Sequence, residues 1–278
     1  MIPQSFKDMP RWWRDGSQWL DALPGLVRAQ CSAWHLTVAG EAMHGSNALV
    51  VPVTRDGDDY VLRLSPPGPE VTDQVAALRF WAGRGTVALI EADAGAMLLE
   101  RLGGSLADVP VAEAMHVLGR TMRRLAVPAP AGVPSTATVV ARRMAAMERP
   151  DRPFDRAILR HALDIGSRLS RTTSGLAVDG DLHSAQVLRG RREPWLVVDP
   201  VLMRGDIAYD LGRILWTRLD EMTNIAGHFD EVVRAADLDR DHARDWVFFR
   251  AVDYWLWGLT AGLTEDPERC RRLVAAVA

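Results

Sequence analysis

The hydrophobic pattern of the sequence changes once along the chain, and this change restricts the folds that the chain can adopt. From Trp34 to Arg101, short β-rich runs alternate with turns rich in Gly, Pro and Asp, as expected for a small antiparallel sheet. Beyond Ser105, apolar residues recur mainly at helical spacing over long segments. We therefore predict an α+β fold with two lobes, residues 1–102 and residues 103–278.

The N-terminal lobe is predicted to contain a five-stranded antiparallel sheet and one helix. After the breaker at 66–69, which is rich in Pro and Gly, apolar residues recur at helical spacing from Val71 to Ala82. The polar loop 55–59 contains Gly57 and has the length of a hairpin connection. The predicted strands are His35–Ala39, Ala48–Thr54, Tyr60–Ser65, Thr86–Ile90 and Ala96–Glu100.

The C-terminal lobe is predicted to be mainly helical, with one β-hairpin inside it. Strand-like segments Val187–Arg189 and Trp195–Val198 flank a turn at 190–193, which is the pattern of a hairpin. Leu102–Gly104, ahead of this lobe, has the flexibility of a hinge. Helical patterns cover Val111–Ala126, Thr136–Glu148, Phe154–Arg171 and several segments after Ile207.

Composition argues against several classes of partner. The formal net charge of -3 does not provide the basic surface that nucleic-acid binding needs, although a cationic substrate is compatible with it. Cys31 and Cys270 lie far apart and imply neither a disulfide framework nor a zinc site. The N-terminus lacks a signal-like apolar segment, and the apolar stretch 255–263 is about half a membrane span. We expect a cytoplasmic protein, monomeric or weakly dimeric, without nucleic-acid or membrane partners.

Two carboxylates bracket the predicted hairpin. Asp181 precedes its first strand, and Asp199 follows its second strand. In kinase-type phosphotransferases, one such Asp orients the substrate hydroxyl and accepts its proton, while a second Asp holds Mg²⁺ against the nucleotide phosphates. The alternative is that residues 179–181 form only a turn, because Asp-Gly is a common turn dipeptide.

The sequence Gly-Asp-Leu-His at 180–183, followed by Val-Val-Asp-Pro at 197–200, resembles the aminoglycoside phosphotransferase family. Within that family it is most similar to the streptomycin 6-kinase and hydroxyurea phosphotransferase branch, and the likeness extends over residues 77–85, 98–102 and 205–211. The resemblance implies a bilobal protein-kinase-like fold, ATP and Mg²⁺ as co-substrate and metal, and a small molecule with a hydroxyl group as acceptor. It also implies that Asp181 is the catalytic base and that Asp199 is the main Mg²⁺ ligand.

Two residues depart from the kinase pattern on the nucleotide side. Arg63 stands where the third strand of such kinases supplies a Lys, and a forked guanidinium does not replace an ammonium conservatively. In such kinases this Lys pairs with a Glu on the following helix, and Gln74 occupies that position here. Glu70, one helical turn earlier, is therefore a candidate partner for Arg63. The alternatives are an Arg63 that points to solvent and a Glu70 that is an ordinary acid at a helix N-terminus.

Four further positions complete the candidates around the nucleotide and the catalytic loop. Gln186 occupies the place of a metal-binding Asn, with its amide oxygen displaced by about 1.5 Å through the extra methylene. Gly45 and Ser46 are candidates to cover the nucleotide phosphates, although a hairpin turn also favours small residues there. The resemblance assigns Glu100 to nucleotide binding as well.

The acceptor is expected to bind through acids and aromatic residues, most of them beyond Asp206. Asp179 stands where the family often has His, and it either binds a cationic substrate or belongs to a turn. The remaining candidates are Asp220, Glu221, Asp253 and Trp255, and the alternative for these is that they are solvated acids or core aromatic residues. His183 is expected to be structural rather than a metal ligand. Asp206 and Asp210 are expected to cap a helix and to support the catalytic loop.

The function predicted from these residues is ATP-dependent phosphorylation of a hydroxyl on a small molecule, most plainly an aminoglycoside-type antibiotic such as streptomycin. Such a reaction would confer resistance by inactivating the antibiotic. Two alternatives remain open at this point: a kinase of a sugar or amino sugar, and a degenerate kinase fold that binds nucleotide or ligand without turnover. The second alternative is motivated by the joint departures at Arg63, Gln74 and Gln186.

Overall fold

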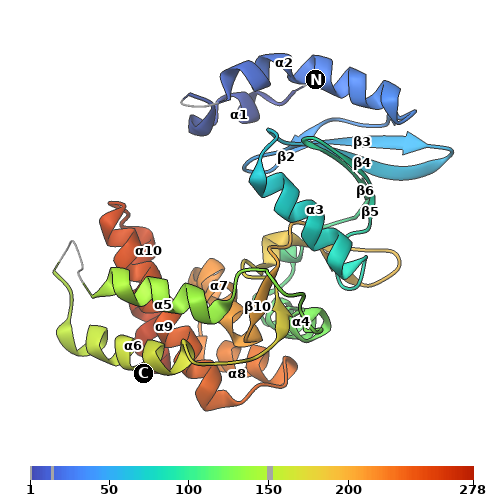
Figure 1. The fold of residues 1–278 in the computed structure, drawn as a ribbon. Helices are drawn as coiled ribbons and strands as arrows, with labels where there is room; N and C mark the ends of the chain where they lie inside the picture. Colours follow the sequence, from blue (N-terminus) through green and yellow to red (C-terminus); the bar gives the residue numbers. More distant parts are fainter. Residues whose placement is uncertain (1, 14–15, 149–152) are drawn as a thin grey trace. The chain divides into compact units, whose positions relative to one another are not determined.

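The computed structural model describes residues 2–13, 16–148 and 153–278 (Figure 1). It is an α+β structure that divides into two compact units, Met1–Gly103 and Gly104–Ala278. The division falls one residue beyond the boundary expected from the sequence, at the end of the β-rich region. Each unit has its own secondary structure and is described separately.

The first unit contains a six-stranded antiparallel sheet rather than the predicted five strands. The additional strand is β2, Met43–His44, which pairs with β3 and was expected to be part of a loop. The hydrogen-bonded order is β1-β3-β4-β6-β5. The other strands are β1 Thr37–Val38, β3 Leu49–Arg55, β4 Asp58–Leu64, β5 Leu89–Asp93 and β6 Ala96–Glu100.

Strand β5 begins three residues later than the predicted start at Thr86. The two-residue turn Ala94–Gly95 pairs Asp93 directly with Ala96, so the residues next to the turn form the strand. Gly95 has φ 79°, and a Cβ there would lie 2.6 Å from the carbonyl oxygen of Ser65. The turn therefore sets the register, and Thr86 is left outside the ladder.

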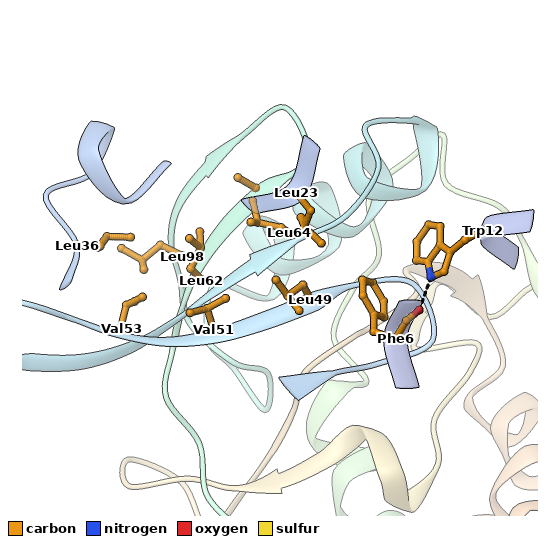
Figure 2. Packing of buried hydrophobic residues seen from close by; sticks show 11 residues of the cluster. Phe6, Trp12, Leu23, Leu36, Leu49, Val51, Val53, Leu62, Leu64 and Leu98 are labelled. Atoms are coloured by element: carbon orange, nitrogen blue, oxygen red, sulfur yellow. Dashed lines mark hydrogen bonds between the residues drawn. The ribbon is translucent and has the colours of Figure 1, made fainter. Parts of the chain in front are cut away.

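One face of this sheet is covered by the segment that precedes it. Alternate residues of β3, such as Leu49 and Val51, are buried against α1 Gln4–Lys7, the 3₁₀ turn Pro10–Trp13 and α2 Ser17–Ala33. Figure 2 shows this packing, in which the indole Nε1 of Trp12 donates a 2.7 Å hydrogen bond to the carbonyl oxygen of Phe6. The sequence analysis included residues 1–33 in the N-terminal lobe but predicted no helices there.

Truncation of Phe6 is expected to lower the free energy of unfolding by about 3–5 kcal/mol, since Phe6 is fully buried and packs edge-on against Trp12 and Trp19. Chemical denaturation of Phe6→Ala followed by tryptophan fluorescence measures the loss. Leu26→Ala on α2, where Leu26 is 39% exposed, is the matched control and should change stability by less than about 0.5 kcal/mol. Equal stability of the two variants would contradict the observed packing.

The predicted helix after the Pro-rich breaker is confirmed as α3, Pro69–Trp81. It starts with Pro at its first position, where the missing N–H costs no hydrogen bond, and it buries Val71, Leu78 and Trp81.

Arg63 on β4 lies opposite Val50 and Met97 in the ladder, so it points to the sheet face opposite the one that carries Leu62 and Leu64.

The second unit is mainly helical, as predicted, with the long helix α9, Arg240–Thr260, packed against α6, α7 and α10. The predicted hairpin is confirmed as β8 Val187–Arg189 and β9 Trp195–Val197. A second strand pair was not predicted: β7 Leu176–Val178 lies antiparallel to β10 Met203–Gly205. The helices are α4 Val111–Leu125, α5 Thr136–Met147, α6 Arg156–Leu169, α7 Leu211–Thr217, α8 Ile225–Ala235, α9 and α10 Glu265–Val277, with 3₁₀ turns at Leu106–Asp108, Ser184–Gln186, Ile207–Asp210 and Leu219–Glu221.

The described part of the chain contains no helix long and apolar enough to span a lipid bilayer. Cys31 and Cys270 are free thiols, as their separation in the sequence suggested.

Candidate active site

The loop that carries Asp181 is shaped by the pairing of β7 with β10. Residues 179–181 follow β7 directly, and Met203 at the start of β10 lies opposite Val178 in the ladder. Gly180 has φ 83°, and a Cβ there would lie 2.6 Å from the sulfur of Met203. The close approach and the left-handed backbone both require glycine between the two aspartates.

Asp179 lies inside this loop rather than on a substrate-facing surface. Its side chain is 1% exposed, and its Oδ1 accepts hydrogen bonds from the backbone N–H groups of Val201 at 3.1 Å and Asp181 at 3.4 Å. The carboxylate thus ties the start of the loop to the chain that leaves the hairpin. This placement argues against the predicted contact with a cationic substrate, and it favours the turn role.

Asp181 is more accessible, with its side chain 38% exposed. One carboxylate oxygen, Oδ1, lies 2.8 Å from Nε of Arg213 in an ion pair without hydrogen-bond alignment. The other oxygen, Oδ2, accepts a 3.4 Å hydrogen bond from the amide Nε2 of Gln186. The carboxylate is therefore oriented from both sides and still reachable from solvent.

Gln186 links the two predicted catalytic aspartates. Its Nε2 also donates to the backbone carbonyl oxygen of Asp199 at 3.3 Å, and its own carbonyl accepts the N–H of Val198 at 2.9 Å. Two acceptors around the NH₂ group define the orientation of the amide. The oxygen Oε1 is then buried without a hydrogen-bond partner among the described residues.

The unpartnered Oε1 fits the donor set of a magnesium ion. Mg²⁺ binds oxygen atoms, usually those of one or two carboxylates together with phosphates and water, and it needs no all-protein cage. The described residues contain no cluster of three or more His, Cys, Asp or Glu side chains arranged for a metal. Asp199, which is partly buried at the end of the hairpin, would supply the carboxylate beside Gln186.

Arg213 lies next to Asp181 and was not selected by the sequence analysis. It lies on α7, and its guanidinium stacks over Trp216 at 5.0 Å, while Trp216 in turn stacks on Tyr254 at 5.6 Å. A basic residue three positions after Asp210 was a visible signal. Its pairing with Asp181 depends on how α7 packs, which the spacing alone does not reveal.

The supporting residues have the roles expected of them. Asp206 caps the following 3₁₀ turn through a 3.0 Å hydrogen bond from the N–H of Ala208. Asp210 is buried and accepts backbone N–H groups of Gly180 and Leu182, and its burial raises its pKa to about 7. Burial, together with the nearby charge of Arg213, lowers the pKa of His183, which favours the neutral ring and a structural role.

In the first unit, Arg63 is 7% exposed, so the alternative of a solvent-facing arginine is wrong. Its guanidinium donates to Ser65 Oγ at 2.9 Å and to Asn47 Oδ1 at 3.2 Å, which places it beside the turn that contains Gly45 and Ser46. This turn joins β2 to β3, and the N–H of Gly45 donates to the carbonyl oxygen of Ala48 at 3.0 Å.

The remaining nucleotide-side candidates have structural contacts or none. Glu70 is exposed on the first turn of α3, with no hydrogen bond or ion pair among the described residues, so the suggested pairing with Arg63 is not supported. Gln74 is 6% exposed on the buried face of the same helix. The carboxylate of Glu100, at the end of β6, accepts a 2.8 Å hydrogen bond from the N–H of Ala88, just before β5.

Two of the acids predicted to bind the acceptor are already paired with arginine near the surface. Asp220 accepts Arg269 at 2.6 Å and Arg272 at 2.7 Å, which lowers its pKa. Glu221 accepts Nε of Arg218 at 2.7 Å. These carboxylates are available to a cationic acceptor only if it displaces an arginine.

The last two acceptor candidates lie on α9. Asp253 is 4% exposed and accepts two hydrogen bonds from Nε of Arg143, at 2.7 and 2.9 Å. Trp255 packs edge-on against Phe154 with ring centroids 4.9 Å apart. Both placements agree with the alternative, core packing, rather than with an acceptor surface.

Sequence comparison places most of the chain in one family. The family model described as aminoglycoside/hydroxyurea antibiotic resistance kinase matches residues 33–262. A hydroxyurea phosphotransferase from Kitasatospora aureofaciens is 35% identical over 277 residues, which cover 91% of this chain and 78% of that relative. A streptomycin 6-kinase from Streptomyces griseus is 34% identical over 268 residues, which cover 90% of this chain and 87% of that relative.

Solved structures share the fold at much lower identity. Choline kinase LicA from Streptococcus pneumoniae has a TM-score of 0.62 at 10% identity, covering 92% of this chain and 98% of its own. Aminoglycoside phosphotransferase APH(4)-Ia has a TM-score of 0.61 at 17% identity, covering 92% of this chain and 99% of its own. These neighbours confirm the predicted protein-kinase-like fold. The family model and the sequence relatives lead to one conclusion: the chain belongs to the aminoglycoside/hydroxyurea antibiotic resistance kinase family.

Proposed function

We propose that this protein transfers a phosphoryl group from ATP to a hydroxyl of an aminoglycoside-type antibiotic such as streptomycin, and that it inactivates the antibiotic in this way. The observation that carries the proposal is the amide of Gln186, which connects the carboxylate of Asp181 to the backbone of Asp199. Membership in the antibiotic resistance kinase family supports the class of acceptor.

The accessible carboxylate of Asp181 acts as the base in this reaction. It accepts the proton of the acceptor hydroxyl, while the acceptor oxygen forms a bond to the terminal phosphorus and the bond from that phosphorus to the bridging oxygen of ADP breaks. Arg213 and Gln186 hold the carboxylate from either side, so its orientation does not depend on the acceptor. Positioning of this kind is the main contribution a protein makes to phosphoryl transfer.

Asp199 and the Oε1 of Gln186 are the groups that would hold Mg²⁺, and Mg²⁺ when bound supplies positive charge to the nucleotide phosphates. The additional methylene of Gln186, compared with the usual Asn, is used here to reach both Asp181 and Asp199. Arg63, with the adjacent turn at Gly45 and Ser46, stays our prediction for the phosphate contacts of the first unit.

The decisive experiment is a coupled assay of ADP release with a panel of acceptors: streptomycin, hygromycin B, hydroxyurea, choline and an amino sugar. We expect release that depends on streptomycin and a phosphorylated product that no longer inhibits bacterial growth. Release with the amino sugar alone would favour the sugar-kinase alternative. A flat response to every acceptor, with nucleotide binding retained, would contradict the proposal in favour of a binder without turnover.

Replacement of Gln186 by Leu, which keeps a similar volume but removes both amide atoms, is expected to raise the Mg²⁺ concentration for half-maximal ADP release by at least about tenfold. A titration of Mg²⁺ at saturating ATP measures it. Gln18→Leu, at an exposed position of α2, is the matched control and should leave the titration unchanged. An unaltered Mg²⁺ requirement in Gln186→Leu would remove Gln186 from the metal site.

A further inference from the structure

Two carboxyl groups are buried together behind the catalytic loop, and each has one oxygen without a partner. Asp179 and Asp210 are 1% and 2% exposed. Oδ1 of Asp179 accepts the backbone N–H groups of Asp181 and Val201. The carboxyl of Asp210 accepts those of Gly180 and Leu182. The other oxygens, Oδ2 of Asp179 and Oδ1 of Asp210, are buried and accept no hydrogen bond from any described residue.

Among the described residues, the buried cation that acts on Asp210 is Arg250, on the neighbouring helix. Arg250 of α9 is buried and acts electrostatically on Asp210, while its two Nη atoms donate to the hydroxyl groups of Tyr209 and Tyr254. Its guanidinium lies 3.9 Å from the centroid of the Tyr209 ring. Arg250 therefore provides one positive charge without a direct hydrogen bond to either carboxyl.

The other charged groups around the pair are already matched. Asp181, on the loop itself, is paired with Arg213 of α7 at 2.8 Å. Asp253, which faces Arg250 on α9, is paired with Arg143 of α5 at 2.7 Å. Within the described residues, two buried carboxyls thus share one buried cation, and two ionised carboxylates would leave one negative charge uncompensated. Burying such a charge costs far more than binding a proton.

The pKa shifts of the two carboxyl groups also favour a bound proton. Burial raises the pKa of Asp179 well above its ordinary value, and the negative charge of Asp210 raises it further. Burial also raises the pKa of Asp210 to about 7, against the opposing effect of Arg250 and with the support of the Asp181 charge. Carboxyl groups that interact this closely titrate as a pair.

We infer that Asp179 and Asp210 share one proton, held between Oδ2 of Asp179 and Oδ1 of Asp210, and that this proton locks the loop that carries Asp181. The proton gives both unpartnered oxygens a hydrogen bond and leaves the pair with a single negative charge opposite Arg250. Because Asp179 holds the N–H of Asp181 and Asp210 holds those of Gly180 and Leu182, the proton joins the two anchors of the loop. Its loss places two like charges behind Asp181 and loosens the anchor.

The proton itself is tested without any assay of activity. The native pair holds a proton that the unfolded chain releases above pH 3.8, so the contribution of the pair to the folding equilibrium constant should fall about tenfold per pH unit above pH 3.8, until the native pair itself loses the proton. In Asp179→Asn the amide NH₂ replaces the proton, so this part of the pH dependence should disappear. Asp210→Asn should behave in the same way, and Asp73→Asn, at an exposed position of α3, should keep the wild-type dependence.

Infrared spectroscopy of the wild-type protein provides a test that does not require either variant to fold. With ¹³C-labelled aspartate, the carbonyl band of a protonated carboxylic acid should be present at pH 6, where exposed aspartates are ionised, and it should vanish at the higher pH where the pair loses its proton. Absence of this band at pH 6, or an unchanged pH dependence of stability in both Asn variants, would overturn the shared proton.

The effect on Asp181 rests on the proposed function and is measured separately. The turnover rate of the wild-type enzyme should fall on the alkaline side as the pair loses its proton, and Asp179→Asn should shift this fall to higher pH. An alkaline limb that does not move, in an enzyme whose infrared band titrates as expected, would overturn the positioning role. Lack of turnover with every acceptor would refute the proposed function and leave the stability and infrared results to decide the proton.

Discussion

Replacement of Asp181 by Asn is expected to reduce the rate of phosphoryl transfer by about 10²–10⁴-fold, because the amide cannot accept the proton of the acceptor hydroxyl. The change is nearly isosteric, and the single amide oxygen keeps one of the two contacts, with Arg213 or with Gln186. The loop should retain its conformation because its anchors at Asp179 and Asp210 are unchanged. Steady-state ADP release at saturating ATP and streptomycin measures the loss.

Nucleotide binding separates a catalytic defect in this variant from a folding defect. The thermal stabilisation of Asp181→Asn by Mg²⁺ and ATP should match that of the wild type, because Asp181 is not proposed to hold the nucleotide. Asp164→Asn, at an exposed position of α6, is the control and should keep full turnover. Wild-type turnover in Asp181→Asn would refute its assignment as the base.

Replacement of Asp199 by Asn is expected to lower turnover by about 10³-fold or more, since a metal carboxylate contributes several kcal/mol of charge stabilisation in the transition state. The backbone carbonyl of Asp199, which accepts the amide of Gln186, is unaffected, so the hairpin contact should persist. Single-turnover measurements over a range of Mg²⁺ concentrations determine the loss.

The two variants should differ in nucleotide binding. Asp199→Asn should lose most of the stabilisation by Mg²⁺ and ATP, whereas Asp181→Asn should retain it. The same stabilisation in both variants would show that Asp199 does not hold the metal. Partial recovery of Asp199→Asn turnover at high Mg²⁺ would agree with a weakened metal site.

Several elements were predictable because their signals are local. The β8–β9 hairpin is two short runs with a Gly-containing turn between them, and α3 follows a Pro-rich breaker with Pro at its first position. Asp181 and Asp199 were recognised by their places on either side of that hairpin. In each case the residues that determine the structure lie within about twenty positions of one another.

Other elements depend on pairing between distant segments. Strand β7 has three residues and is paired with β10, about 25 positions further on, which neither segment signals by itself. The two-residue strand β2 forms because β3 is beside it. The ion pair between Arg213 and Asp181 likewise requires α7 to be packed against the loop.

The sequence by itself determined the fold class, the hairpin and the two aspartates around it, because hydrophobic period, turn residues and motif spacing are properties of neighbouring residues. Only the tertiary structure decided what surrounds each carboxylate. Asp179, Asp181 and Asp210 are the same residue type within about thirty positions, yet two are buried and one is accessible beside an arginine. Burial and the distance to the nearest cation determine the protonation and the role of a carboxyl, and both are set by segments that meet only when the chain folds.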